Sequence, residues 1–144
     1  MPNPKRKRFW ITAVAVFVVL FNVGFVFHDL LFGEWFHSQQ PYARDHYIVP
    51  YIAAAFAAYA LILAHLYPIY RAAYPKRRPW AVGLQFGLLM GVLFDALQGG
   101  IIELATLPMP LSVFFVDSGY HVLIEGPLAG AIVTAVYERV TVPR

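Results

Sequence analysis

Three ionisable residues recur at intervals of four in an otherwise apolar stretch near the C-terminal end of the chain: Asp117, His121 and Glu125. Side chains four apart on an α-helix drift by only about 40° around its axis, so these three form one polar stripe. Two carboxylates and an imidazole in a row can bind a divalent cation such as zinc, manganese or iron, can pass protons, or can bond to one another and fix helix packing. The spacing leaves all three kinds of chemistry open.

Further polar side chains interrupt the other apolar stretches. They are Asn22, Asp29, Asp95 and Gln98. Counting outward from the middle of each stretch at about 1.5 Å per residue puts Asn22 and Asp95 near the level of His121 and Glu125, with Asp117 about 10 Å farther out. Asp29 and Gln98 continue the same faces outward. We therefore expect one polar core that opens toward one end of a helix bundle.

The charges of this core do not balance. Asp95, Asp117 and Glu125 face at most one imidazolium, that of His121, and no Lys or Arg lies in these stretches. Because burial disfavours uncompensated carboxylates, either protons or a cation must accompany them. A divalent metal ion would use His121, Glu125 and Asp95, with His28, Asp29 or Asp117 as a further ligand. We do not expect a bis-histidine haem, because His28 and His121 differ in depth by about 8 Å on the same count.

The amino-acid composition indicates which class of protein contains this polar core. Only 13% of the 144 residues are charged and 60% are hydrophobic, whereas about a quarter of the residues of a soluble domain are charged. This excludes an ordinary soluble domain and indicates an integral membrane protein. The chain contains no Cys, which excludes thiolate metal sites and a Cys nucleophile.

Four apolar stretches are long enough to cross the hydrocarbon core of a bilayer, which takes about 20 residues. They cover residues 9–29, 48–70, 80–102 and 111–137. Little chain remains outside them, so residues 1–144 form a single domain. The predicted fold is an all-α bundle of four transmembrane helices.

The basic residues predict the orientation of these spans. Ten of the 11 Lys and Arg residues flank the spans on one side, and short loops rich in Lys and Arg stay cytoplasmic. They are Lys5, Arg6, Lys7 and Arg8, then Arg71, Lys76, Arg77 and Arg78, and finally Arg139 and Arg144. Both termini are therefore expected in the cytoplasm of a bacterium, with the protein in the inner membrane and the polar core facing outward. Split among three short segments, these residues do not predict nucleic-acid binding.

Glycines recur every four residues in the third and fourth spans. They are Gly83, Gly87, Gly91, Gly126 and Gly130. Small residues at this spacing let membrane helices approach closely, so we expect these faces to pack. Pro127 lacks the N–H of a helical hydrogen bond and should distort the fourth span. Because four helices bury few faces, we expect contacts with membrane lipid and either self-association through these glycine faces into a homo-oligomer or docking onto a partner in a larger membrane complex.

Two stretches resemble a bacterial family of small four-helix membrane proteins that is known as a domain of unknown function. One is LFGEW at residues 31–35, and the other is DSGYH at residues 117–121, which is followed by Gly126 and Gly130. The resemblance covers most of the chain in the number and order of spans. It implies a four-helix fold and no established activity, so it assigns no functional residues.

The leading functional hypothesis is a small membrane protein that uses an outward-facing polar cavity for ion- or proton-coupled transport of a small solute. The first alternative is a metal-dependent membrane enzyme or metal-binding protein built on His121, Glu125 and Asp95. The second is a structural or accessory subunit of a membrane complex.

Overall fold

The computed structural model describes residues 4–40, 42, 44 and 46–139, with the backbone alone at residues 4, 5 and 98. Arg144, which enters the predicted orientation, lies outside the described residues. So does the side chain of Gln98, which the sequence predicts in the polar core.

Within the described residues, four helical segments are long and apolar enough to cross a membrane. They cover residues 6–31, 49–72, 79–106 and 111–139. Each begins and ends within four residues of the stretch predicted from the sequence. The predicted all-helical architecture with four apolar spans is therefore confirmed.

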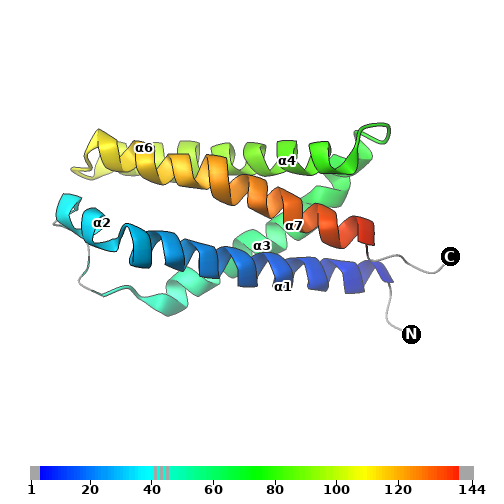
Figure 1. Cartoon of the computed structure of the whole chain (residues 1–144), viewed down its shortest axis with the longest axis horizontal. Helices are drawn as coiled ribbons and strands as arrows, with labels where there is room; N and C mark the ends of the chain where they lie inside the picture. The colour runs from blue at the N-terminus through cyan, green and yellow to red at the C-terminus, as the bar shows by residue number, and fades with distance from the viewer. Residues whose placement is uncertain (1–3, 41, 43, 45, 140–144) are drawn as a thin grey trace.

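The spans divide into α-helices and π-helices, the latter labelled η. In chain order the elements are α1 (Pro4–Phe25), η1 (Val26–Leu31), α2 (Gly33–Gln39), α3 (Val49–Ala72), α4 (Pro79–Met90), η2 (Gly91–Gly100), α5 (Ile101–Thr106), α6 (Leu111–Tyr120), η3 (His121–Glu125) and α7 (Gly126–Arg139). In Figure 1, α4 runs along α7, α1 runs beside α7, and α3 crosses behind both. The first residues of α1 and the last of α7 lie at the same end of the bundle.

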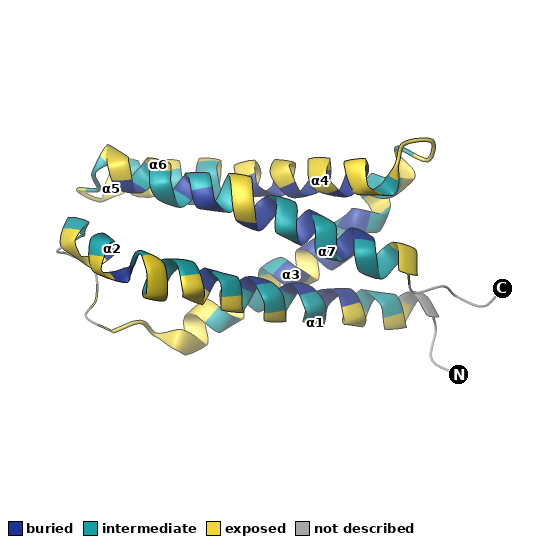
Figure 2. Cartoon of the chain, in the orientation of Figure 1, coloured by how far each residue is buried: buried dark blue, intermediate teal, exposed yellow. Residues whose placement is uncertain are grey.

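The bundle has two dissimilar ends, which we name by their residues. The packed end comprises residues 6–20, 60–72, 79–90 and 126–139, and the cavity end comprises the described residues of 21–59 and 91–125. The hydrophobic core lies almost wholly at the packed end, where Figure 2 shows buried residues facing one another across α1, α4 and α7. Its largest fully buried side chains include Tyr67, Phe86, Leu20 and Leu63.

Glycines bring α4 and α7 into backbone contact at the packed end. A Cβ atom added at Gly87 would collide with the carbonyl of Gly126, and one added at Gly83 or Gly130 would collide with the backbone of the other glycine. At Gly91 it would lie 2.8 Å from the carbonyl oxygen of His121. The glycines predicted to pack thus face each other inside one chain. A second copy would have to bind elsewhere, so self-association stays a prediction that needs another surface.

The π-helices all lie at the cavity end and bear most of the predicted polar core. His28 and Asp29 lie on η1, Asp95 on η2, and His121 and Glu125 on η3. A π-helix bonds i to i+5, and such turns are rare and frequent at functional sites. On the fourth span, η3 ends directly before Gly126 and Pro127, next to the position where the sequence predicts a distortion.

Candidate functional site

The polar stripe of the fourth span is continuous in the structure. Nδ1 of His121 lies 2.8 Å from Oε2 of Glu125, whose side chain is buried, and Nε2 lies 3.8 Å from Oδ1 of Asp117. His121 and Glu125 are the first and last residues of η3 and lie four residues apart. One imidazole therefore lies between two carboxylates of its own span.

Asp95 approaches this stripe from the third span. Its Oδ1 lies 3.8 Å from Nδ1 of His121, and its Oδ2 is buried with no hydrogen-bond partner among the described residues. The hydroxyls of Tyr59 and Tyr120 are also buried and have no hydrogen-bond partner among the described residues. The structure thus brings Asp95 and Glu125 to the same nitrogen of His121, and leaves buried oxygen atoms around them without partners.

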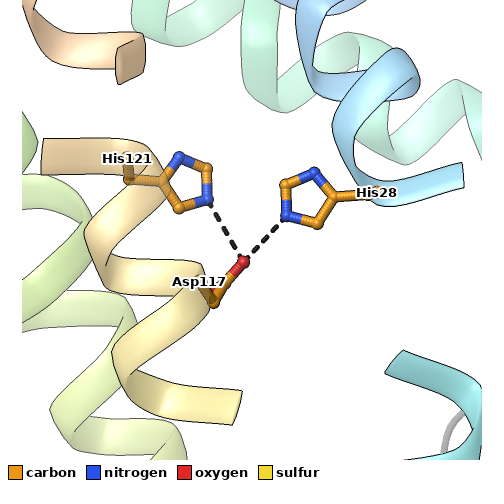
Figure 3. A group of neighbouring side chains, drawn as sticks. All are labelled: His28, Asp117 and His121. Atoms are coloured by element: carbon orange, nitrogen blue, oxygen red, sulfur yellow. Dashed lines mark hydrogen bonds and ion pairs between the residues drawn. The ribbon is translucent and has the colours of Figure 1, made fainter. Parts of the chain in front are cut away.

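His28 reaches the stripe from the first span. Its Nε2 lies 2.8 Å from Oδ1 of Asp117 (Figure 3). Its Nδ1 lies 3.0 Å from the carbonyl oxygen of Gly24. The ring centroids of His28 and His121 are 5.6 Å apart. The estimate that these two histidines differ in depth by about 8 Å is therefore wrong as a measure of their separation. Counting residues assumed straight spans with level centres, whereas both histidines lie on π-helical turns and reach toward each other.

Hydrogen bonds select the same ring nitrogen for both histidines. The Gly24 carbonyl can only accept, so we assign the N–H of His28 to Nδ1, which donates to it. We likewise assign Nδ1–H of His121 as the donor to the Glu125 carboxylate. Each imidazole then presents Nε2 toward the same oxygen atom of Asp117, as the dashed lines in Figure 3 show.

One ligand atom each from His28, Asp117 and His121 lies within 4.8 Å of the others, close enough to share a metal ion. Asp95 and Glu125, predicted as ligands, lie instead on the Nδ1 side of His121. Asp117, which the sequence interpretation allowed only as a further ligand, is the carboxylate that lies with the two imidazoles. Nothing in the spacing within one span could have shown this, because His28 is 89 residues away from Asp117.

Aromatic rings surround the His28 imidazole. Phe36 of α2 stacks on it with centroids 5.4 Å apart, and Phe27 and Tyr120 meet it edge on at 5.0 and 5.2 Å. Phe27 and Tyr120 also stack on each other at 4.0 Å and so join η1 to α6. These contacts restrict the rotation of His28 and hold the first span against the fourth at the level of the site.

A cavity of about 630 Å³ adjoins the three residues. His28, Asp117 and His121 line it, together with Asp29 and Asn22. Asn22 is exposed and donates to the carbonyl of Val18 on its own helix, so it belongs to the cavity wall. The structure gives it no hydrogen bond to the stripe.

The other walls of the cavity differ in character. Side chains of α1 and α3 make an apolar wall, which is formed by Phe21, Phe25, Val49, Ile52 and Phe56. Polar groups that sequence analysis did not single out also line it, namely Gln40, Tyr47 and Glu103. Glu103 lies one residue past the predicted end of the third span. The helix continues to Thr106, which brings this carboxylate to the cavity.

Tyr47 lies outside the spans, between α2 and α3. Burial, and then the carboxylate of Asp29, raise the pKa of its phenol above the ordinary value. The hydroxyl therefore stays protonated at neutral pH and is available as a hydrogen-bond donor at the cavity.

Comparisons of the chain with models of protein families, with curated proteins and with solved structures find no match. The resemblance to small four-helix bacterial proteins stays a prediction. Function is consequently argued from the site alone.

Proposed function

We propose that this chain is an integral membrane protein that binds a divalent transition-metal ion through His28, Asp117 and His121, and that the ion acts on a molecule bound in the adjoining cavity. The observation that carries the proposal is the direction of the two imidazoles. Both nitrogens Nε2 face one oxygen of Asp117, at 2.8 and 3.8 Å, while both nitrogens Nδ1 bond to oxygen acceptors.

That arrangement is the one that metal-binding histidines adopt. A metal-ligating imidazole usually donates its other N–H to a carbonyl or a carboxylate, which fixes the ring and makes the ligand more basic. Gly24 supplies the carbonyl for His28, and Glu125 supplies the carboxylate for His121. Without a proton or a cation between them, two nitrogen lone pairs and a carboxylate would repel one another.

The distances suit a small ion. Zinc binds imidazole nitrogen at about 2.0–2.1 Å and carboxylate oxygen at about 2.0–2.2 Å, so neighbouring ligand atoms of a tetrahedral site lie roughly 3.4 Å apart. The two N···O separations in the structure, 2.8 and 3.8 Å, lie on either side of that value. Two imidazoles and one carboxylate suit zinc, iron or manganese, and three protein ligands leave coordination positions for water or substrate. We therefore propose a reactive site in preference to a closed structural one.

Metal content tests this proposal directly. The protein, purified in lipid nanodiscs and incubated with zinc, iron or manganese, should retain one ion per chain after dialysis, as measured by elemental mass spectrometry. His28→Ala, Asp117→Ala and His121→Ala should each lose it. The matched control is His65→Ala, which removes an exposed histidine of α3. Retention of metal by all three site variants, or no retained metal in the parent protein, would overturn the proposal.

We further propose that the spans cross a bacterial inner membrane with both termini in the cytoplasm, which puts the metal site in the outer half of the bilayer. The support is the distribution of Lys and Arg. Because the chain has no Cys, single cysteines report on sidedness without background. Ser38→Cys should react with an impermeant maleimide in intact cells, and Ala73→Cys only after lysis. The reverse pattern would contradict this topology.

The same line of groups supports a second candidate, proton-coupled movement of a small solute. His28, Asp117 and His121 lead from the cavity to buried Glu125 without a gap wider than 3.8 Å. Proteoliposomes should then show a proton flux that Glu125→Gln abolishes. Unchanged flux in that variant would exclude this candidate.

A further inference from the structure

The charge of the cavity wall limits what the cavity can bind. Carboxylates of Asp29, Glu103 and Asp117 line it, and no Lys or Arg is among the described residues that do so. Asp117 is engaged with His28 and His121. Asp29 and Glu103 form no ion pair with any residue in the described part of the chain. Two carboxylates therefore face this space without an ion pair to Lys or Arg, and the basic side chains among its described lining residues are the imidazoles of His28 and His121.

The rest of the cavity lining is largely aromatic and aliphatic. Phe21 of α1 and Phe56 of α3 meet edge to face with centroids 5.9 Å apart, and Phe25 and Ile52 also line the space. Phenyl faces attract cations within about 6 Å of the ring centroid. A volume of about 630 Å³ is in the range of pockets that bury drug-sized molecules. A lining that combines carboxylates with phenyl rings complements a molecule with a cationic head and an apolar body.

We propose that the cavity binds an amphipathic organic amine in its protonated form, with the ammonium group at Asp29 and Glu103 and the apolar body against Phe21, Phe25 and Phe56. This deepens the proposed function by naming the class of molecule that is held beside the metal ion, and in that sense it rests on it. An anionic amphiphile of the same shape is disfavoured. A divalent ion would carry two positive charges, but Asp117, Asp29 and Glu103 carry three negative ones, so the cavity keeps a net negative charge beside the bound molecule.

Three probes that share a phenylbutyl group and differ in the charge of the terminal group test the charge requirement. Phenylbutylamine, phenylbutanol and phenylbutyrate are each equilibrated by dialysis against nanodiscs with and without the protein. We expect protein-dependent binding of the amine that is at least about tenfold tighter than that of the carboxylate, with the alcohol between them. Equal binding of amine and carboxylate, or no protein-dependent binding of the amine, would overturn the proposal.

Matched variants test the place of binding. Ile52→Trp fills the apolar side of the cavity and should abolish amine binding, whereas Ile62→Trp, an equally exposed position of α3 that does not line the cavity, should leave it unchanged. Asp29→Asn combined with Glu103→Gln changes little in shape and should reduce the affinity for the amine to that for the alcohol. An amine affinity that survives both the Ile52 variant and the double variant would also overturn the proposal.

Metal content measured on the same samples separates the two hypotheses, since none of these variants changes a proposed metal ligand. Retained metal with no preference for the amine refutes the ligand class and leaves the metal site standing. Amine binding that follows the predicted variants in a protein without metal refutes the metal site and supports the ligand class.

Discussion

The packed end and the cavity end differ in whether their buried polar atoms have hydrogen-bond partners. At the packed end, buried polar atoms are satisfied locally: Thr134 Oγ1 lies 2.8 Å from the Gly130 carbonyl, to which it donates, and 3.1 Å from the hydroxyl of Tyr67. At the cavity end, Asp95 Oδ2 and the hydroxyls of Tyr59 and Tyr120 are buried without partners among the described residues.

This difference shows that the contacts that stabilise the bundle and the groups that could react lie at opposite ends of it. The glycine contact of α4 with α7 binds the spans tightly, and in lipid such close packing is a main source of helix association. Beyond Gly91 and Gly126 the spans become π-helical and enclose a cavity lined by charged groups. Buried polar atoms without partners cost free energy, so the cavity end depends on the packed end to remain folded.

The largest expected effect on stability comes from a substitution that separates the helices of the packed end. Gly87→Val puts a side chain into the backbone of Gly126, which cannot withdraw without separating α4 from α7. Overpacking of this kind should lower the free energy of unfolding by about 3 kcal/mol or more. The measurement is reversible unfolding in mixed detergent. If the variant cannot be purified in folded form, the yield of folded protein relative to the parent protein is measured in its place.

The control for that variant is a glycine of the cavity end. A Cβ atom at Gly119 meets nothing within 4 Å, so Gly119→Ala should raise the free energy of unfolding by up to about 1 kcal/mol through helix propensity. If both glycine variants had equal effects, the packed end would not be the stabilising region.

The next effect concerns the cavity end alone. Glu125→Gln removes the negative charge that accepts the Nδ1–H of His121, and loss of such a partner typically weakens metal binding by about 10- to 100-fold. The readout is metal affinity by competition with a chelator. Glu138→Gln, the same change at an exposed residue of α7, should leave the affinity unchanged. An unaltered affinity in the Glu125 variant would contradict the role of Glu125 as a positioning residue.

A pair of tyrosines compares the two ends directly. Tyr67→Phe removes a partner of the buried Thr134 hydroxyl and should lower the free energy of unfolding by about 1 kcal/mol. Tyr59→Phe removes a buried hydroxyl that has no partner among the described residues, and this change should not lower the free energy of unfolding. Both are measured by the same unfolding titration. A larger loss of unfolding free energy for Tyr59→Phe than for Tyr67→Phe would contradict the view that buried polar groups are hydrogen-bonded at the packed end and unpartnered at the cavity end.

The smallest effect is expected at the surface of the packed end. Nε of Arg71 lies 3.4 Å from Oε1 of Glu138, in a pair whose acidic partner is exposed. Such pairs contribute about 0–1 kcal/mol and less at high salt. Unfolding of Glu138→Gln at low and high ionic strength should differ from the parent protein by no more than this, and a greater loss would show that the pair belongs to the core of the packed end.

Part of the site could be predicted from the sequence because it depends on one helix. The order Asp117, His121, Glu125 follows from helical periodicity, and the contact of Gly83 and Gly87 with α7 follows from the spacing of small residues. The approach of His28 could not be predicted in the same way. It depends on the crossing of two spans and on π-helical turns, for which the sequence offered Pro127 as its one signal.

The amino-acid sequence by itself determined the number, the limits and the apolar character of the four spans, because twenty consecutive apolar residues suffice to specify a helix that can cross a bilayer. It also determined that buried acids outnumber their basic partners. Only the tertiary structure decided which acids meet which imidazoles. It set Asp117 between the Nε2 atoms of His28 and His121, and moved Asp95 and Glu125 to the other side of His121. The physical reason is that helix periodicity fixes the face on which a side chain lies, whereas the partner across that face depends on how the spans cross.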